Sequence, residues 1–145
     1  MNYRHSFHAG NFADLVKHAL VLWLVETLRP TAVIDTHAGA GLYDLSGDAA
    51  RSKEAEAGVA RLMTAEGRPP LLDALAERVA AFNPQGGVRY YPGSPLLIVE
   101  ALGSDARYVG FELNPPVRVL LSEALAGRAN AEAREGDGYV AAGGG

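Results

Sequence analysis

The segment Thr31–Gly41 constrains the fold of this 145-residue chain more than any other feature of the sequence. It begins with Thr31–Asp35, an apolar and β-branched run that is typical of a buried strand. It continues as Thr36–Gly41, where Gly39 and Gly41 let the backbone turn tightly and approach a ligand closely. A strand followed by such a turn is typical of open α/β sheets, in which ligands bind at the carboxyl ends of the strands.

Two more strands are expected, at Tyr108–Glu112 and Ala131–Glu135. Leu42–Arg51 is predicted to be a loop, and Tyr90–Pro95 a turn in which Pro95 takes the first position of the next helix. Helices are predicted at five places: Phe12–Leu28, Glu54–Ala65, Leu71–Phe82, Pro95–Leu102 and Pro115–Ala126. Because strands alternate with helices, the sequence predicts an α/β fold with a parallel, doubly wound sheet.

The first helix is delimited by clear signals. Asn11 is a good N-cap, Asp14 follows it at the spacing of a capping box, and Pro30 ends the helix. Its apolar positions are expected to form one broad buried face made of Phe12, Leu15, Val16, Ala19, Leu20 and Trp23.

Composition excludes several classes of protein. The chain has no cysteine, which excludes a disulfide framework, a thiolate nucleophile and a cysteine-based zinc site. The longest apolar run, Ala19–Val25, is too short to cross a bilayer, and the N-terminus has no signal-peptide core. A net charge of −4 argues against a strongly basic surface that grips nucleic acid without sequence preference. We expect a cytoplasmic protein that does not bind membranes.

Each of the three predicted strands ends in an acid. Asp35 suits a cationic group such as the amino group of a methionine moiety, Glu112 can accept hydrogen bonds from ribose hydroxyls, and Asp137 can accept one from an adenine amino group. Together they predict a nucleoside pocket. In the dinucleotide-binding fingerprint the acid follows the glycines by about 20 residues, whereas Asp35 precedes them, so a dinucleotide-dependent oxidoreductase is the weaker alternative.

The four histidines lack the spacing of a metal site, and no metal is expected; a role in lining a pocket or capping is favoured for them. Near the N-terminus, flat rings alternate with hydrogen-bond donors at Tyr3, Arg4, His5, Phe7 and His8. RNA bases stack on such groups. A tail that packs over the sheet would have the same composition, so both interpretations stay open.

Three motifs carry a resemblance to a known family. They are Tyr3–Asp14 with Lys17 and His18, then Asp35–Gly41, then Arg89–Pro95. They resemble the ribosomal RNA large subunit methyltransferase J family, whose members methylate the N6 amino group of one adenine in 23S ribosomal RNA. The resemblance extends to Gly138.

The resemblance implies a Rossmann-like S-adenosylmethionine-dependent methyltransferase fold that is incomplete here, with its first three strands, an N-terminal helix and a small helical insertion. Residues 1–145 would be the N-terminal part of the domain, with the N-terminal motif and helix in 1–29 and the insertion at about 46–86. The implied S-adenosylmethionine contacts are Lys17, His18, His37, Ser94, Glu112, Asp137 and Gly138. Tyr3 matches a tyrosine that meets the RNA.

The sequence departs from the family in one respect. Members carry an Asp-Pro-Pro-Tyr segment that holds the target adenine, which must be unstacked first. No such segment occurs in these 145 residues, so we expect a truncated or partial sequence that has no catalytic residue of its own and is inactive alone. The reading frame beyond the codon for Gly145 should then encode that segment, and the first strand here should keep an unpaired apolar edge.

The resemblance further implies 23S ribosomal RNA as the partner, before full ribosome assembly, and a monomeric protein. The alternative that the residues leave open is a non-catalytic module that binds S-adenosylmethionine or RNA. A dinucleotide-binding oxidoreductase fragment is the less favoured alternative.

Overall fold

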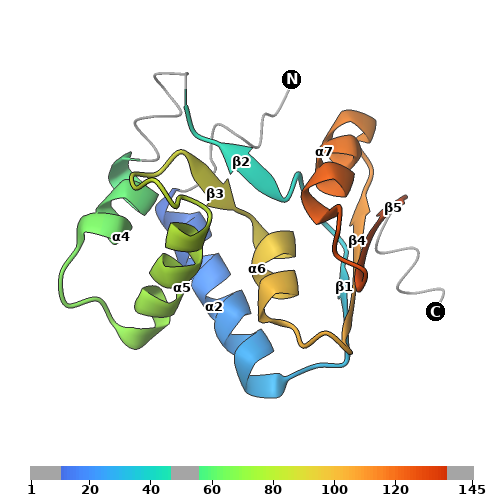
Figure 1. The fold of residues 1–145 in the computed structure, drawn as a ribbon, viewed down its shortest axis with the longest axis horizontal. Coiled ribbons are helices and arrows are strands. Elements are labelled where there is room, and N and C mark those ends of the chain that lie inside the picture. The colour runs from blue at the N-terminus through green and yellow to red at the C-terminus, as the bar shows by residue number, and fades with distance from the viewer. Residues whose placement is uncertain (1–10, 47–55, 137–145) are drawn as a thin grey trace. The chain divides into compact units, whose positions relative to one another are not determined.

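The computed structural model describes residues 11–46 and 56–136 (Figure 1). The chain divides into two compact units. The helical unit comprises Met1–Trp23 with Tyr43–Pro92, and the sheet unit comprises Leu24–Leu42 with Gly93–Gly145. Among the described residues, no helix is both long enough and apolar enough to span a membrane.

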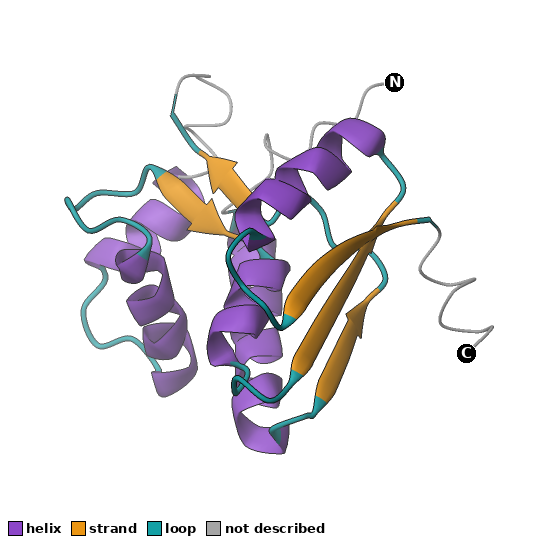
Figure 2. Ribbon diagram, turned by 45° about the vertical axis from the view of Figure 1, so that its right-hand side comes forward, coloured by secondary structure: helices purple, strands orange, loops and turns teal. Residues whose placement is uncertain are grey.

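The sheet unit is built on three parallel strands, as the sequence predicts. These are β1 (Ala32–Asp35), β4 (Arg107–Glu112) and β5 (Ala131–Glu135), in the order β1-β4-β5 (Figure 2). In this register Asp35 lies beside Gly110, and Glu112 beside Glu135. The carboxyl ends of all three strands therefore meet at one edge of the sheet.

Two helices pack against this sheet. Helix α6 (Ser94–Ala101) contacts β4, and helix α7 (Pro115–Leu125) contacts both β4 and β5. Asn114 caps the N-terminus of α7, since its side-chain oxygen accepts a hydrogen bond from the Val117 amide at 3.2 Å, and Pro115 follows it at the first helical position. Pro95 takes the second position of α6 rather than the predicted first, because the helix begins at Ser94.

Strand β1 is not the buried strand that the sequence predicts. Ala32 is exposed, and the Ile34 side chain is 56% exposed. Among the described residues β1 pairs with β4 alone, so it is an edge strand whose side chains are only partly covered. The edge position agrees with the expected unpaired apolar edge of this strand. Because no strand in the described part of the chain covers one side of β1, its apolar residues are not fully buried.

The helical unit contains a π-helical turn η1 (Glu56–Ala60), helix α4 (Arg61–Thr64) and helix α5 (Pro70–Ala81). The predicted helix at Glu54–Ala65 is thus a π-helical turn followed by one short α-helix in the part that is described. Pro70 lies inside α5 rather than before it, because proline is tolerated in the first turn, where its missing N–H is not needed.

The sequence analysis missed a two-stranded sheet formed by β2 (Leu42–Asp44) and β3 (Tyr90–Pro92). The loop predicted at Leu42–Arg51 therefore starts with a strand, and the predicted turn at Tyr90–Pro95 is a strand followed by the start of α6. Asn83 explains how β3 is held. Its side chain accepts the amide hydrogens of Arg89 and Tyr90 and donates to the carbonyls of Val79 and Tyr90.

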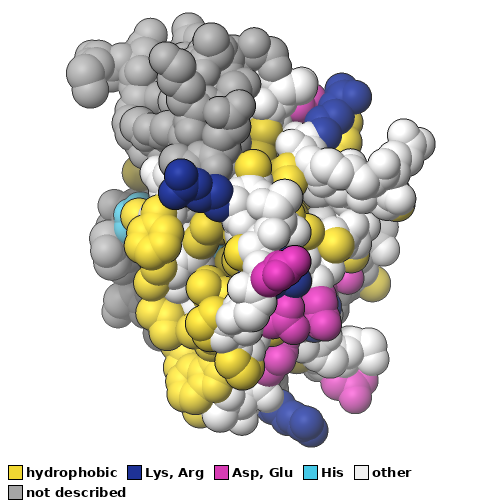
Figure 3. All heavy atoms as spheres, turned by 90° about the vertical axis from the view of Figure 1, so that its left-hand side faces the viewer, with side chains coloured by type: hydrophobic (Ala, Val, Ile, Leu, Met, Phe, Trp, Pro, Cys, Tyr) yellow, Lys and Arg dark blue, Asp and Glu magenta, His cyan; other side chains and the backbone are white. Residues whose placement is uncertain are grey.

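Helix α2 (Phe12–Leu28) runs through the boundary between the two units. Its bounds and its N-cap are as predicted, because the Asn11 side chain accepts a hydrogen bond from the Asp14 amide at 2.9 Å. The predicted buried face is partly wrong. Leu15 and Ala19 are buried, together with His18, Leu22 and Val25, whereas Phe12, Val16, Leu20 and Trp23 are all more than 40% exposed. Hydrophobic side chains gather on the molecular face that Figure 3 presents.

Candidate functional site

The loop after β1 is the centre of the candidate site, and hydrogen bonds fix it at three points. The Ala38 amide donates to the Phe111 carbonyl at 3.1 Å, and the Gly39 amide donates to Glu112 Oε1 at 3.1 Å. The Gly93 amide donates to the Gly41 carbonyl at 2.7 Å. The end of β4 and the start of α6 therefore hold the loop in one conformation.

Both the backbone conformation and the close packing at position 41 require a glycine there. Its φ of +86° lies in the left-handed region that residues with a side chain avoid. A Cβ atom there would lie 3.0 Å from the Ala124 Cβ and 3.4 Å from Leu121 Cδ1, both on α7. The loop thus packs against α7 without room for a side chain.

Asp35 ends β1, and its half-buried carboxylate is held from two sides. Its Oδ2 atom accepts hydrogen bonds from the Ser94 hydroxyl at 3.2 Å and from the Tyr108 hydroxyl at 2.9 Å. Within residues 11–46 and 56–136, the hydrogen bond that its Oδ1 atom accepts is the longer one from the His37 amide, at 3.3 Å. The carboxylate therefore has a fixed orientation and keeps acceptor capacity at Oδ1.

Glu112 ends β4 and links two segments. Its Oε1 accepts from the Gly39 amide, and its Oε2 accepts from the Asn114 amide at 2.9 Å. Each carboxylate oxygen carries two lone pairs, so each can accept one further hydrogen bond. Glu112 thus fixes the glycine loop and still offers two acceptor positions.

The structure brings four of the sequence-derived residues together in the sheet unit: Asp35, His37, Ser94 and Glu112. The His37 side chain is exposed, and its Nδ1 lies 3.0 Å from the Thr36 hydroxyl. Ser94 is the first residue of α6. All four lie at or beside the carboxyl ends of β1 and β4, where the sequence predicts the pocket.

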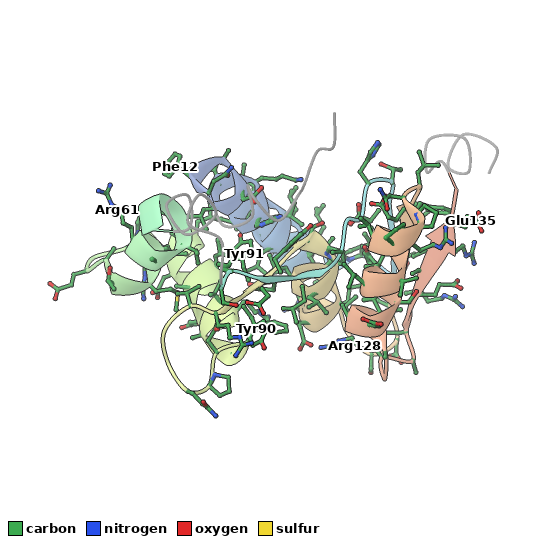
Figure 4. The ribbon with its side chains drawn as sticks, turned by 90° about the horizontal axis from the view of Figure 1, so that it is seen from above. Phe12, Arg61, Tyr90, Tyr91, Arg128 and Glu135 are labelled. Atoms are coloured by element: carbon green, nitrogen blue, oxygen red, sulfur yellow. The ribbon has the colours of Figure 1, made fainter. Side chains whose placement is uncertain are left out.

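Lys17 and His18 belong to the helical unit, whereas the other four residues belong to the sheet unit. Lys17 is exposed on α2. The His18 ring is buried, and its Nδ1 lies 2.6 Å from the hydroxyl of the buried Tyr91. Burial, and to a lesser extent the charge of Lys17, lowers the pKa of His18 to about 4. Figure 4 shows Tyr90 and Tyr91 on opposite sides of β3.

Three predicted residues lie outside the described part of the chain: Tyr3, Asp137 and Gly138. Two residues of the sheet unit that the sequence analysis did not select border the site. Tyr108 donates to Asp35, and Leu113, which directly follows Glu112, is 65% exposed. Both signals were present in the sequence, namely a tyrosine two residues before a glycine in a strand and an apolar residue after a strand-end acid.

The arrangement provides a fixed carboxylate, a second carboxylate with spare acceptor positions, and an exposed apolar side chain beside it. Such a set suits a ligand with a cationic group, a diol and a flat apolar ring.

Comparisons with known proteins identify the family to which the chain is similar. A family model described as "Ribosomal RNA large subunit methyltransferase D, RlmJ" matches residues 28–143. The chain is 38% identical over 144 residues to the Ribosomal RNA large subunit methyltransferase J of Escherichia coli, covering 96% of this chain and 51% of that protein. It is 36% identical over 121 residues to the protein of the same name from Haemophilus influenzae, covering 79% and 43%.

A crystal structure of a Legionella pneumophila protein matches with a TM-score of 0.79 and 29% identity, over 92% of this chain and 51% of that one. The chain spans about half the length of the curated relatives it matches. The similarity of sequence and of structure leads to one conclusion: the chain belongs to the ribosomal RNA large subunit methyltransferase J family.

Proposed function

We propose that this chain is the cofactor-binding part of an S-adenosylmethionine-dependent methyltransferase that modifies N6 of an adenine in 23S ribosomal RNA. Residues 1–145 would form the N-terminal part of a Rossmann-like methyltransferase domain, with a helical insertion at about 46–86. The observation that carries the proposal is that Asp35, the glycine loop and Glu112 adjoin one another at the carboxyl edge of a parallel sheet.

The chemistry of the residues fits the cofactor. Asp35 would accept hydrogen bonds from the ammonium group of the methionine end through Oδ1, with Ser94 beside it. Glu112 would accept the ribose hydroxyls through the remaining lone pairs of its two oxygens, and the exposed Leu113 would cover the adenine ring. When bound, the cofactor supplies an electrophilic methyl group.

The remaining contacts follow from the family resemblance. His37, Lys17, His18, Asp137 and Gly138 would complete the cofactor site, and Tyr3 would meet the RNA. The residues described here would bind and orient the methyl donor, and the Asp-Pro-Pro-Tyr segment that positions the adenine in the family does not occur in these 145 residues. In this account the complete reading frame carries the activity, and the partner is 23S ribosomal RNA before full ribosome assembly.

Calorimetry on the 145-residue chain tests cofactor binding. S-adenosylhomocysteine should bind, and NAD should not, because the acid lies before the glycines and no helix follows them directly. Glu112→Ala should weaken S-adenosylhomocysteine about tenfold by removing the ribose acceptors. Glu123→Ala, an exposed position on α7, serves as the matched control and should leave the affinity unchanged.

The absence of binding heat with S-adenosylhomocysteine, or binding of NAD alone, would contradict the proposal. Activity is tested separately with the complete reading frame and protein-free 23S ribosomal RNA. Nuclease digestion and mass spectrometry should then detect N6-methyladenine. If the cofactor binds but the complete protein modifies no adenine, the non-catalytic binding module becomes the better account.

A further inference from the structure

We propose that Tyr108 is a positioning residue that acts through Asp35 to select ligands carrying an amino-acid end. The inference rests on the proposed function, because it assigns how the methionine end of the cofactor is recognised. Its basis is the hydrogen bond of 2.9 Å from the Tyr108 hydroxyl to Asp35 Oδ2.

The path from Tyr108 to Asp35 depends on a glycine. Tyr108 pairs with Val33 across the sheet, whereas Asp35 pairs with Gly110. The tyrosine side chain therefore has to extend along the strand past position 110. A Cβ atom on Gly110 would lie 2.7 Å from the Tyr108 hydroxyl oxygen and 3.0 Å from its ring carbon Cε1. The absence of a side chain at Gly110 opens the way to the carboxylate.

The hydroxyl of Tyr108 is a permanent donor. The side chain is fully buried, and burial, followed by the charge of Asp35 and the hydrogen bond to it, raises the pKa of Tyr108. The phenol therefore stays protonated at any pH at which the protein works. The geometry directs this O–H to Oδ2 of Asp35.

The two oxygens of Asp35 are consequently different. Among the residues that the structure describes, Oδ2 receives two hydroxyl donors, from Tyr108 and Ser94, whereas Oδ1 receives the longer bond from the His37 amide. The hydroxyl donors fix the plane of the carboxylate and direct an incoming ammonium group to Oδ1. Hydrogen bonds between ionised partners are short and directional, so a rotated carboxylate would bind that group less well.

A purely structural tyrosine would stabilise the sheet unit and affect every ligand alike. A positioning tyrosine would affect only ligands that use Asp35. Two probes separate these roles. S-adenosylhomocysteine carries the amino-acid end, and 5′-methylthioadenosine shares the adenosine and sulfur but lacks the ammonium and carboxylate groups.

Calorimetry with both probes on Tyr108→Phe in the 145-residue chain is the test. The variant should bind S-adenosylhomocysteine about tenfold more weakly, the loss of one hydrogen bond to a charged group, and should bind 5′-methylthioadenosine within about twofold of the parent. Tyr90→Phe makes the same chemical change in the helical unit, and as the control it should change neither affinity. An equal loss for both probes, or no loss for S-adenosylhomocysteine, would overturn the inference.

Asp35→Glu gives a second test, which does not require that Tyr108→Phe folds. Asp35 is only half-buried. The substitution keeps the negative charge but shifts the carboxylate away from the Tyr108 hydroxyl, so S-adenosylhomocysteine should again be weakened selectively. If both variants fold, their effects should not add, because they disturb one arrangement. Full S-adenosylhomocysteine affinity in Asp35→Glu would overturn the inference. Failure of the unsubstituted chain to bind S-adenosylhomocysteine would instead overturn the proposed function.

Discussion

Several residues of the candidate site have two roles each, and Gly41 is the clearest example. It allows the left-handed turn of the loop, and it lets the loop lie against α7. Glu112 similarly fixes the Gly39 amide, and we propose that it also accepts hydrogen bonds from the ligand. A substitution at such a position should therefore affect stability as well as binding, and the two effects need separate measurement.

Gly41→Ala should lower the free energy of unfolding by about 2–3 kcal/mol, from the left-handed backbone and from the close approach to Ala124. Gly127 is the matched control. It has a similar φ of +83°, but a Cβ there would meet nothing within 4 Å. Urea denaturation should thus give Gly127→Ala a loss of only about 1 kcal/mol. Equal losses in the two variants would show that packing against α7 does not matter.

His18 should make stability depend on pH. Its pKa is about 4 in the folded chain and about 6.5 when unfolded, so the unfolded state binds a proton that the folded state does not between these values. Stability should therefore fall as the pH is lowered from about 6.5 to about 4, by up to about 3 kcal/mol. Urea denaturation of His18→Gln should show a smaller fall.

His37→Gln is the control for that measurement, since His18 is still present in it and the fall should persist. A parent chain and a His18→Gln variant with the same pH profile would contradict the assignment of a buried neutral imidazole. A ring titration by NMR would report the His18 pKa directly.

At the scale of elements, local signals decide where helices begin and end. Helix α2 and strand β5 have the bounds that the sequence predicts, because Asn11, Pro30 and Gly136 mark their ends. The buried face of α2 was harder to predict. Apolar residues occur all round this helix, so Leu22 and Phe12 are equally good candidates, and tertiary packing decides between them.

Strands β2 and β3 escaped prediction for a related reason. Each has only three residues, and β3 ends at Pro92, which Gly93 follows; a proline and a glycine in succession are typical of a turn. Their existence depends on long-range contacts such as the Leu45 amide donating to the Arg89 carbonyl at 2.7 Å and on the bonds of Asn83. A pattern in the local sequence does not contain this information.

The N-cap of α2 can be tested on its own. Asn11→Ala removes the acceptor for the Asp14 amide and should lower the free energy of unfolding by about 1 kcal/mol. Asn11→Asp keeps an acceptor at the same place and should retain most of the stability. If urea denaturation finds Asn11→Ala and Asn11→Asp equally stable, the side chain of Asn11 is not the cap.

At the scale of the whole molecule, the sequence predicts the arrangement of the strands that form the site better than the side-chain contacts within it. Three parallel strands with their acid-bearing ends at one edge follow from the alternation of strands and helices, and Asp35, Ser94 and Glu112 lie in one unit. The role of Tyr108 depends on strand register, since only pairing with β1 places its hydroxyl near Asp35. All the predicted cofactor contacts stay predictions, namely those of Lys17, His18, His37, Ser94, Glu112, Asp137 and Gly138.

The central claim is that the carboxyl edge of the sheet binds S-adenosylmethionine. Titration of the ¹⁵N-labelled 145-residue chain with S-adenosylhomocysteine tests it most directly. The amide signals of Gly39, Gly41 and Glu112 should shift and saturate together, while that of Gly103, which precedes β4 at the opposite ends of the strands, should not move. Shifts that centre on Gly103, or unchanged loop signals at saturating ligand, would contradict the account.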